Sequence, residues 1–193
     1  MTARRGLLLA AAALVLVGCG GGDPSASGGD VRVVPAERWI ADFCAAGAAW
    51  RADLDRNARA LTRTLEEART AREARAELVR YFDDAAALTD ATVARVERSG
   101  LPDVDERERL AGDIAGLVAD VGHLFAAAAD ETERLATRDE QRLRARVRAI
   151  ARRLEARAAA LTTRFERIAA TYDVPELDRA FGENDDCKRL AGG

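Results

Sequence analysis

Residues able to do acid–base, nucleophilic or metal chemistry are scarce in this chain of 193 residues, which holds one histidine and three cysteines. His123 follows Asp120 by three residues, a spacing that puts both side chains on one face of a helix. A di-iron helical bundle needs a Glu-x-x-His pair from each of two helices, and this chain has no second histidine. We therefore predict a surface histidine, with no metal site and no cofactor.

Nucleophilic and acid–base catalysis lack their usual patterns as well. The chain contains no Gly-x-Ser-x-Gly sequence, and His123 has no evident nucleophile beside it. Carboxylates are plentiful, but pairs such as Glu66-Glu67 and Asp83-Asp84 are adjacent in sequence. Adjacent residues point to different faces of a helix, which is typical of solvated surface. We predict no catalytic residues and a non-enzymatic protein.

The first 19 residues carry the pattern of an export signal. Arg4 and Arg5 precede an apolar run over 7–17, and small residues follow before Cys19. An apolar run of about 11 residues is well short of the ~20 that a helix needs to cross a bilayer. A permanent transmembrane anchor is therefore the weaker interpretation.

The end of this segment, Leu16-Val17-Gly18-Cys19, resembles the lipobox of bacterial lipoproteins. The resemblance implies that a signal peptide over 1–18 is removed and that the Cys19 thiol is acylated. The protein would then be lipid-anchored at the extracytoplasmic face of the cell membrane. The alternative is an ordinary secretory signal with an incidental cysteine. The Gly- and Ser-rich composition of 19–35 predicts a flexible tether, and 36–193 is expected to form one helical domain.

The resemblance to lipoproteins changes the meaning of the other two cysteines. If Cys19 is acylated, Cys44 and Cys187 remain as an even number in an oxidising compartment. They lie near the two ends of the expected domain, and an even number of helix crossings brings these ends to the same pole. We expect a Cys44–Cys187 disulfide. Two unpaired buried thiols are the alternative.

From Ala36 onward, apolar residues recur at steps of three and four, which indicates amphipathic helices. We predict an all-α domain, an up-down four-helix bundle with a short C-terminal capping helix. The apolar stripes of the four helices run from Trp39 to Leu65, Ala74 to Val96, Leu110 to Leu135 and Leu143 to Tyr172, and the capping helix covers Pro175 to Gly182.

The helix breaks differ in strength. Gly100 and Pro102 separate the two halves, with Gly100 as a left-handed C-cap and Pro102 in the first turn of the next helix. Within the halves, Thr70 with Glu73 and Thr137 with Glu140 have the spacing of a capping box. These two breaks have neither glycine nor proline. The alternative architecture is therefore one long antiparallel hairpin of two helices.

Charge differs sharply between the third and fourth helices. The stretch 101–136 has nine acidic and three basic residues, a net charge of −6, and 138–172 has ten arginines against four acids, a net charge of +6. We expect the two helices to be antiparallel neighbours that neutralise each other. The alternative is that the fourth helix presents a face to anionic lipid or cell-wall polymers, through Arg142, Arg146, Arg148, Arg152 and Arg153. The overall charge of −3 gives no reason to expect a nucleic-acid partner.

Two hypotheses of function follow. The leading one is a cell-envelope protein that binds a protein partner through its helical surface. Its rival is a carrier or sensor that holds an apolar ligand between the helices, near Trp39, Trp50, Phe125 and Phe165, although we expect these residues to form an ordinary core. A large continuous cavity favours the carrier. The tryptophan-bearing first helix and the closing Cys187-Lys188-Arg189-Leu190 also resemble small actinobacterial lipoproteins, a resemblance that implies no activity.

Overall fold

The computed structural model describes residues 31–191, which form a domain of six helices and two very short strands. The elements are β1 (Val33–Val34), α1 (Ala36–Glu67), α2 (Ala71–Arg98), β2 (Leu101–Pro102), α3 (Arg107–Glu133), α4 (Glu140–Tyr172), α5 (Pro175–Glu183) and α6 (Asp185–Ala191). The predicted signal peptide, the lipobox with Cys19 and the tether up to Asp30 lie outside the described residues.

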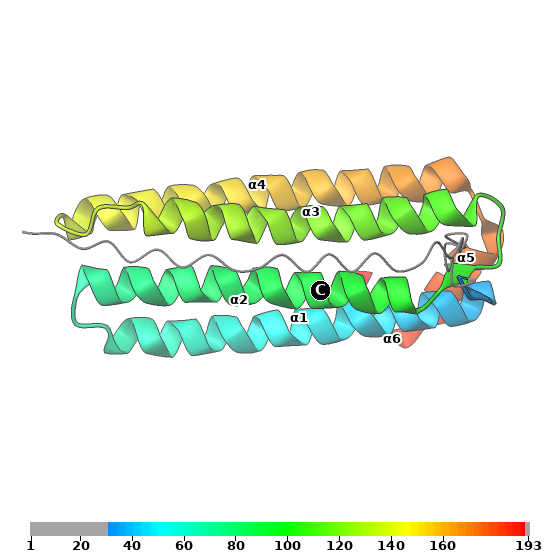
Figure 1. Cartoon of the computed structure of the whole chain (residues 1–193), viewed down its shortest axis with the longest axis horizontal. Helices are drawn as coiled ribbons and strands as arrows, with labels where there is room; N and C mark the ends of the chain where they lie inside the picture. The colour runs from blue at the N-terminus through cyan, green and yellow to red at the C-terminus, as the bar shows by residue number, and fades with distance from the viewer. Residues whose placement is uncertain (1–30, 192–193) are drawn as a thin grey trace, which may run out of the picture. The chain divides into compact units, whose positions relative to one another are not determined.

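The all-α prediction is confirmed, and the long helices run alternately up and down (Figure 1). The principal packing pairs are α1 with α2, α2 with α3, and α3 with α4, while α5 and α6 both pack on α1. The alternative of two very long helices is wrong, because the chain breaks after Glu67 and again after Glu133.

The two breaks within the halves are made by polar caps. Thr70 accepts a hydrogen bond from the Glu73 amide at 3.1 Å, and the Glu73 carboxylate accepts one from the Arg69 amide at 2.7 Å. The predicted cap at Thr137 is wrong by two residues. Asp139 caps α4 instead, accepting a hydrogen bond from the Arg142 amide at 2.9 Å. A carboxylate directly before the first helical turn also suits the positive end of the helix dipole.

The segment between α2 and α3 pairs with the first residues of the domain. β1 pairs in parallel with β2, Val33 opposite Leu101 and Val34 opposite Pro102. Gly100 has φ +91°, and a Cβ there would lie 2.2 Å from the carbonyl oxygen of Arg32, so only glycine fits this crossing. The expectation that Pro102 opens the third helix is wrong, because Pro102 belongs to β2 and α3 begins at Arg107.

The core has two parts. One lies at the end of the bundle where β1, β2 and α5 meet, hereafter the disulfide end, and it includes Trp39, Cys44, Ile114, Ile168 and Cys187. The other lies nearer the α1–α2 and α3–α4 turns, hereafter the turn end, and it includes Phe82, Ala128, Ala129 and Ile150. The capping helix α5 is present as predicted, one residue longer, and α6 follows it.

Candidate ligand cavity between the helices

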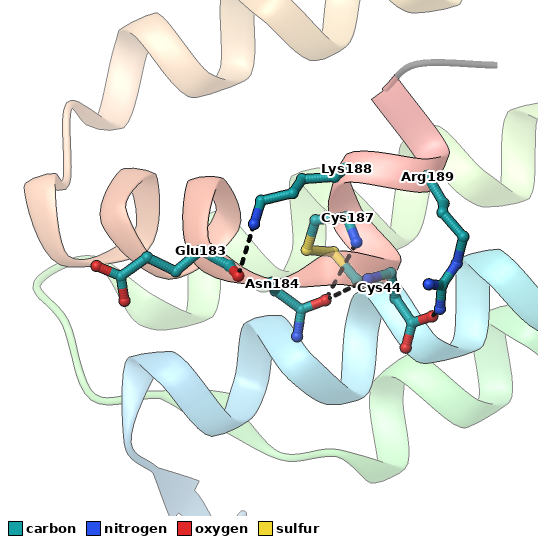
Figure 2. Close-up of a disulfide and its surroundings, with 7 residues drawn as sticks. Cys44, Glu183, Asn184, Cys187, Lys188 and Arg189 are labelled. Carbon is teal, nitrogen blue, oxygen red and sulfur yellow. Dashed lines mark hydrogen bonds and ion pairs between the residues drawn. A yellow bond between two sulfur atoms is a disulfide. The ribbon is translucent and has the colours of Figure 1, made fainter.

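The disulfide end is closed by a helix that the sequence did not predict. Asn184 accepts hydrogen bonds from the amides of Asp186 and Cys187, at 2.9 and 3.1 Å, and so starts α6 (Figure 2). The sulfurs of Cys44 and Cys187 are bonded, and both cysteines are fully buried. Arg51 donates a hydrogen bond to the Arg189 carbonyl at 3.3 Å. α6 is therefore held on α1 by a covalent bond and a side-chain contact.

Next to α6, a cavity of about 540 Å³ opens between α1, α3 and α4. Its walls are almost entirely hydrocarbon. Gly47 leaves room for Leu190 of α6, whose Cδ1 would lie only 2.8 Å from a Cβ at position 47. The lining residues are Phe43, Gly47, Trp50, Thr92, Val96, Leu117, Val118, Val121, Leu124, Phe125, Leu154, Glu155, Ala158, Leu161, Thr162, Phe165 and Leu190.

The indole and hydroxyl groups at this cavity already have partners. The Trp50 indole donates to the Thr89 hydroxyl at 3.0 Å, and Thr89 donates to the Ala85 carbonyl at 2.7 Å. The Thr92 hydroxyl likewise donates to the carbonyl of Leu88, at 2.9 Å. Glu155 is the one charged side chain among the lining residues. A guest would meet hydrocarbon on nearly every side.

A second cavity of about 240 Å³ lies next to the first, toward the disulfide end. Phe43 and Phe165 line both cavities, and Trp39 lines the second one. The expected core packing of Trp39, Trp50, Phe125 and Phe165 is present in part, because Trp39 and Phe165 belong to or pack on the first core cluster and Phe125 packs on the second. Trp39 is 2 % exposed and lines the smaller cavity, whereas the other three line the large one.

The apolar character of α3 is explained by the same arrangement. α3 is the one described helix whose length and mean hydropathy, 1.4, would allow it to cross a membrane. In this domain it packs between α2 and α4. Its residues Leu117, Val121 and Phe125 form a wall of the large cavity. The apolar side of α3 thus lines the large cavity, although only 22 % of its most apolar stretch is buried.

The predicted attraction between α3 and α4 is present in part. Arg153 pairs with Glu131, and Arg164 pairs with Asp120. Near the disulfide end, Tyr172 donates a hydrogen bond to Asp113 at 2.7 Å, and this bond raises the pKa of the Tyr172 phenol above its ordinary value. These contacts tie α4 to α3, and so they hold one wall of the cavity in place.

The five arginines that we singled out on α4 do not act as one face. Arg153 is paired with α3, and Arg148 lines a separate cavity at the turn end. Within the described residues, Arg142, Arg146 and Arg152 are exposed and have no ion-pair partner. Neutralisation by α3 therefore accounts for only part of the arginine-rich helix.

The remaining candidates are dispersed over the domain. The His123 side chain is 81 % exposed and lies 3.9 Å from Asp120, whose other oxygen pairs with Arg164. Between Val31 and Ala191 no group of three or more histidine, cysteine or acidic side chains is arranged to hold a metal ion. Sequence reasoning missed Gly47 and Leu190 as parts of the cavity and Thr89 as the partner of the Trp50 indole. Only the small size of Gly47 within an apolar stripe could have drawn attention to this region.

Comparison of the chain with family models, with curated proteins and with solved structures finds no match. The cavity and its chemistry are therefore the basis for assigning a function.

Proposed function

We propose that this protein is a non-enzymatic carrier or sensor that holds an apolar ligand between α1, α3 and α4. The observation that carries the proposal is the cavity of about 540 Å³ with a hydrocarbon lining. This volume lies within the range of about 300–1,000 Å³ that small-molecule sites usually have. A close-packed bundle interior would hold few spaces larger than a water molecule, so a void of this size favours a ligand over a surface-only role.

The polar groups indicate the kind of ligand. Trp50 and Thr92 already donate to Thr89 and to the Leu88 carbonyl, so the cavity offers little to a polar guest. Glu155 repels a negative headgroup near the opening, since like charges disfavour each other in a partly apolar site. No arginine lines this cavity, although α4 is rich in arginine. The ligand best suited is an uncharged molecule with a long hydrocarbon chain, such as a fatty alcohol or an isoprenoid.

A membrane location for the carrier rests on the N-terminal sequence. We propose that Cys19 is acylated and that the domain lies at the extracytoplasmic face of the membrane, where apolar ligands are available. The Cys44–Cys187 disulfide supports an oxidising compartment, because such bonds persist mainly in exported proteins. Mass spectrometry of protein extracted gently from membranes tests this location. A mature N-terminus at Cys19 with added acyl mass is expected, and an unmodified Cys19 would contradict the anchor.

The ligand proposal predicts selective labelling by a photoreactive hydrocarbon. Membranes carrying the full chain are treated with a long-chain alcohol that has a diazirine near its end, and cross-linked peptides are identified by mass spectrometry. We expect labels on the cavity segments of α1, α3 and α4. Ala158→Phe places a ring inside the cavity and should lower this labelling roughly tenfold, the equivalent of about 1.4 kcal/mol of binding.

Ala160→Phe is the matched control, because Ala160 is exposed on the same helix and does not line the cavity. It should leave the labelling unchanged, and both variants should unfold at the same temperature as the parent chain. Labels scattered over exposed surfaces, equally in both variants, would reject the carrier and favour the surface-binding alternative. A photoreactive fatty acid of equal chain length should label less than the alcohol, and Glu155→Gln should reduce that difference.

A further inference from the structure

A third cavity, of about 480 Å³, lies at the turn end of the bundle. It is formed where the α1–α2 turn meets the first two turns of α4. Its lining residues are Leu65, Ala68, Arg69, Thr70, Ala71, Ala74, Leu78, Glu140, Leu143, Arg144, Val147 and Arg148. The second core cluster, with Phe82 and Ile150, lies between this cavity and the large apolar one. The two cavities are therefore separate sites.

This lining has two chemically different parts. Leu65, Leu78, Leu143 and Val147 provide an apolar floor, and Leu143 is itself buried. The rim carries three guanidinium groups and one carboxylate, Glu140. The large cavity has the opposite sign, since its one charged lining residue is acidic.

Two of the three arginines are available to a ligand. Arg144 pairs with Glu140 at 2.5 Å, which consumes the one acidic group of the rim. Arg69 and Arg148 have no ion-pair partner within residues 31–191. An exposed guanidinium presents planar, paired N–H donors that match a carboxylate or phosphate. The rim therefore has unused positive charge directly above an apolar floor.

The two helix N-termini at this cavity are capped by side chains of their own. The Thr70 hydroxyl accepts the hydrogen bond of the Glu73 amide, and Asp139 accepts that of the Arg142 amide. Each of these side chains thus satisfies one free amide in the first turn of its helix. The attraction for an anion rests on the side chains of Arg69 and Arg148.

We propose that this cavity binds an anionic amphiphile, in which a phosphate or carboxylate group is joined to a short hydrocarbon chain. The anion contacts Arg69 and Arg148, and the chain lies on Leu65, Leu78 and Val147. The anionic half of such a molecule would have no partner at the large cavity, where Glu155 is the one charged lining residue. This site does not depend on the apolar ligand of the preceding section.

The test uses the full chain held in phosphatidylcholine nanodiscs, titrated calorimetrically with hexyl phosphate against empty nanodiscs as the blank. Inorganic phosphate and hexanol, the two halves of the probe, are titrated in the same way. We expect hexyl phosphate to bind at least roughly tenfold more tightly than either half, because charge-assisted hydrogen bonds and apolar burial act together. The double variant Arg69→Gln/Arg148→Gln should weaken the binding of hexyl phosphate by roughly tenfold or more.

The control variant is Arg72→Gln/Arg146→Gln, which removes the same two charges from exposed positions that do not line the cavity. It should bind hexyl phosphate as the parent chain does. Equal binding of inorganic phosphate would reduce the site to a plain anion site and overturn the amphiphile. Equal loss in both double variants would show attraction by net charge alone. Unchanged binding in Arg69→Gln/Arg148→Gln would also overturn the assignment.

Discussion

Replacing both Cys44 and Cys187 by alanine is expected to lower the free energy of unfolding by about 5 kcal/mol. The bond joins residues 143 positions apart, so it closes nearly the whole domain into one loop. In the chain-entropy account, removing such a long cross-link frees the unfolded chain much more than the folded one. Alanine is the suitable replacement because both positions are fully buried and a serine hydroxyl there would lack a partner.

Urea unfolding followed by circular dichroism measures this effect, and the parent chain reduced with dithiothreitol is the control. The reduced parent and the double variant should have nearly the same unfolding midpoint. Peptide mapping without reductant should yield one cross-linked peptide that contains Cys44 and Cys187. Two alkylatable thiols in the isolated protein would show that the bond does not form. A decrease in unfolding free energy of less than about 1 kcal/mol would contradict the stabilisation expected from a cross-link of this length.

Trp39→Ala is expected to lower the free energy of unfolding by about 3–5 kcal/mol, an effect nearly as large as the loss of the disulfide. Trp39 is 2 % exposed and stacks on Phe43, with the ring centres 5.8 Å apart. Its indole also donates to the Gly100 carbonyl at 3.1 Å. The side chain therefore connects α1 to the turn before β2, and its removal leaves both a void and an unpaired carbonyl.

Two further variants separate these contributions in the same urea experiment. Trp39→Phe keeps most of the apolar packing and should lose about 1–3 kcal/mol, mainly for the unpaired Gly100 carbonyl. Trp50→Ala should cost clearly less than Trp39→Ala, because Trp50 is only partly buried and already borders the large cavity. Equal losses at Trp39 and Trp50 would mean that the large cavity is not open space in solution.

Much of the helical framework could be predicted from the sequence because its signals are local. Apolar residues three and four positions apart define each helix. The capping signal at the start of α2 spans only four residues, from Thr70 to Glu73. The same kind of reasoning failed by two residues at α4. There Thr137 and Asp139 both lie near the start of the helix, and the spacing to Glu140 did not reveal which one caps it.

The helix α6 shows how a short local signal can be overlooked. Asn184 before two aspartates is a reasonable N-cap, but a helix as short as Asp185–Ala191 is unstable by itself. It forms here because Cys187 is bonded to Cys44 and Leu190 packs over Gly47. Contacts with a helix about 140 residues earlier in the chain therefore decide its presence.

The residues that could do chemistry in this chain are few, and their scarcity already argued from the sequence against a catalytic or metal centre at His123. The order of the four long helices and the capping helix, and the expectation of a Cys44–Cys187 bond, also follow from the sequence, whereas α6 does not. The cavities do not. An apolar stripe that packs on a neighbouring helix and one that lines open space have the same spacing in the sequence. Only the tertiary structure, in which α4 packs mainly on α3, reveals that Trp50, Phe125 and Phe165 surround a void.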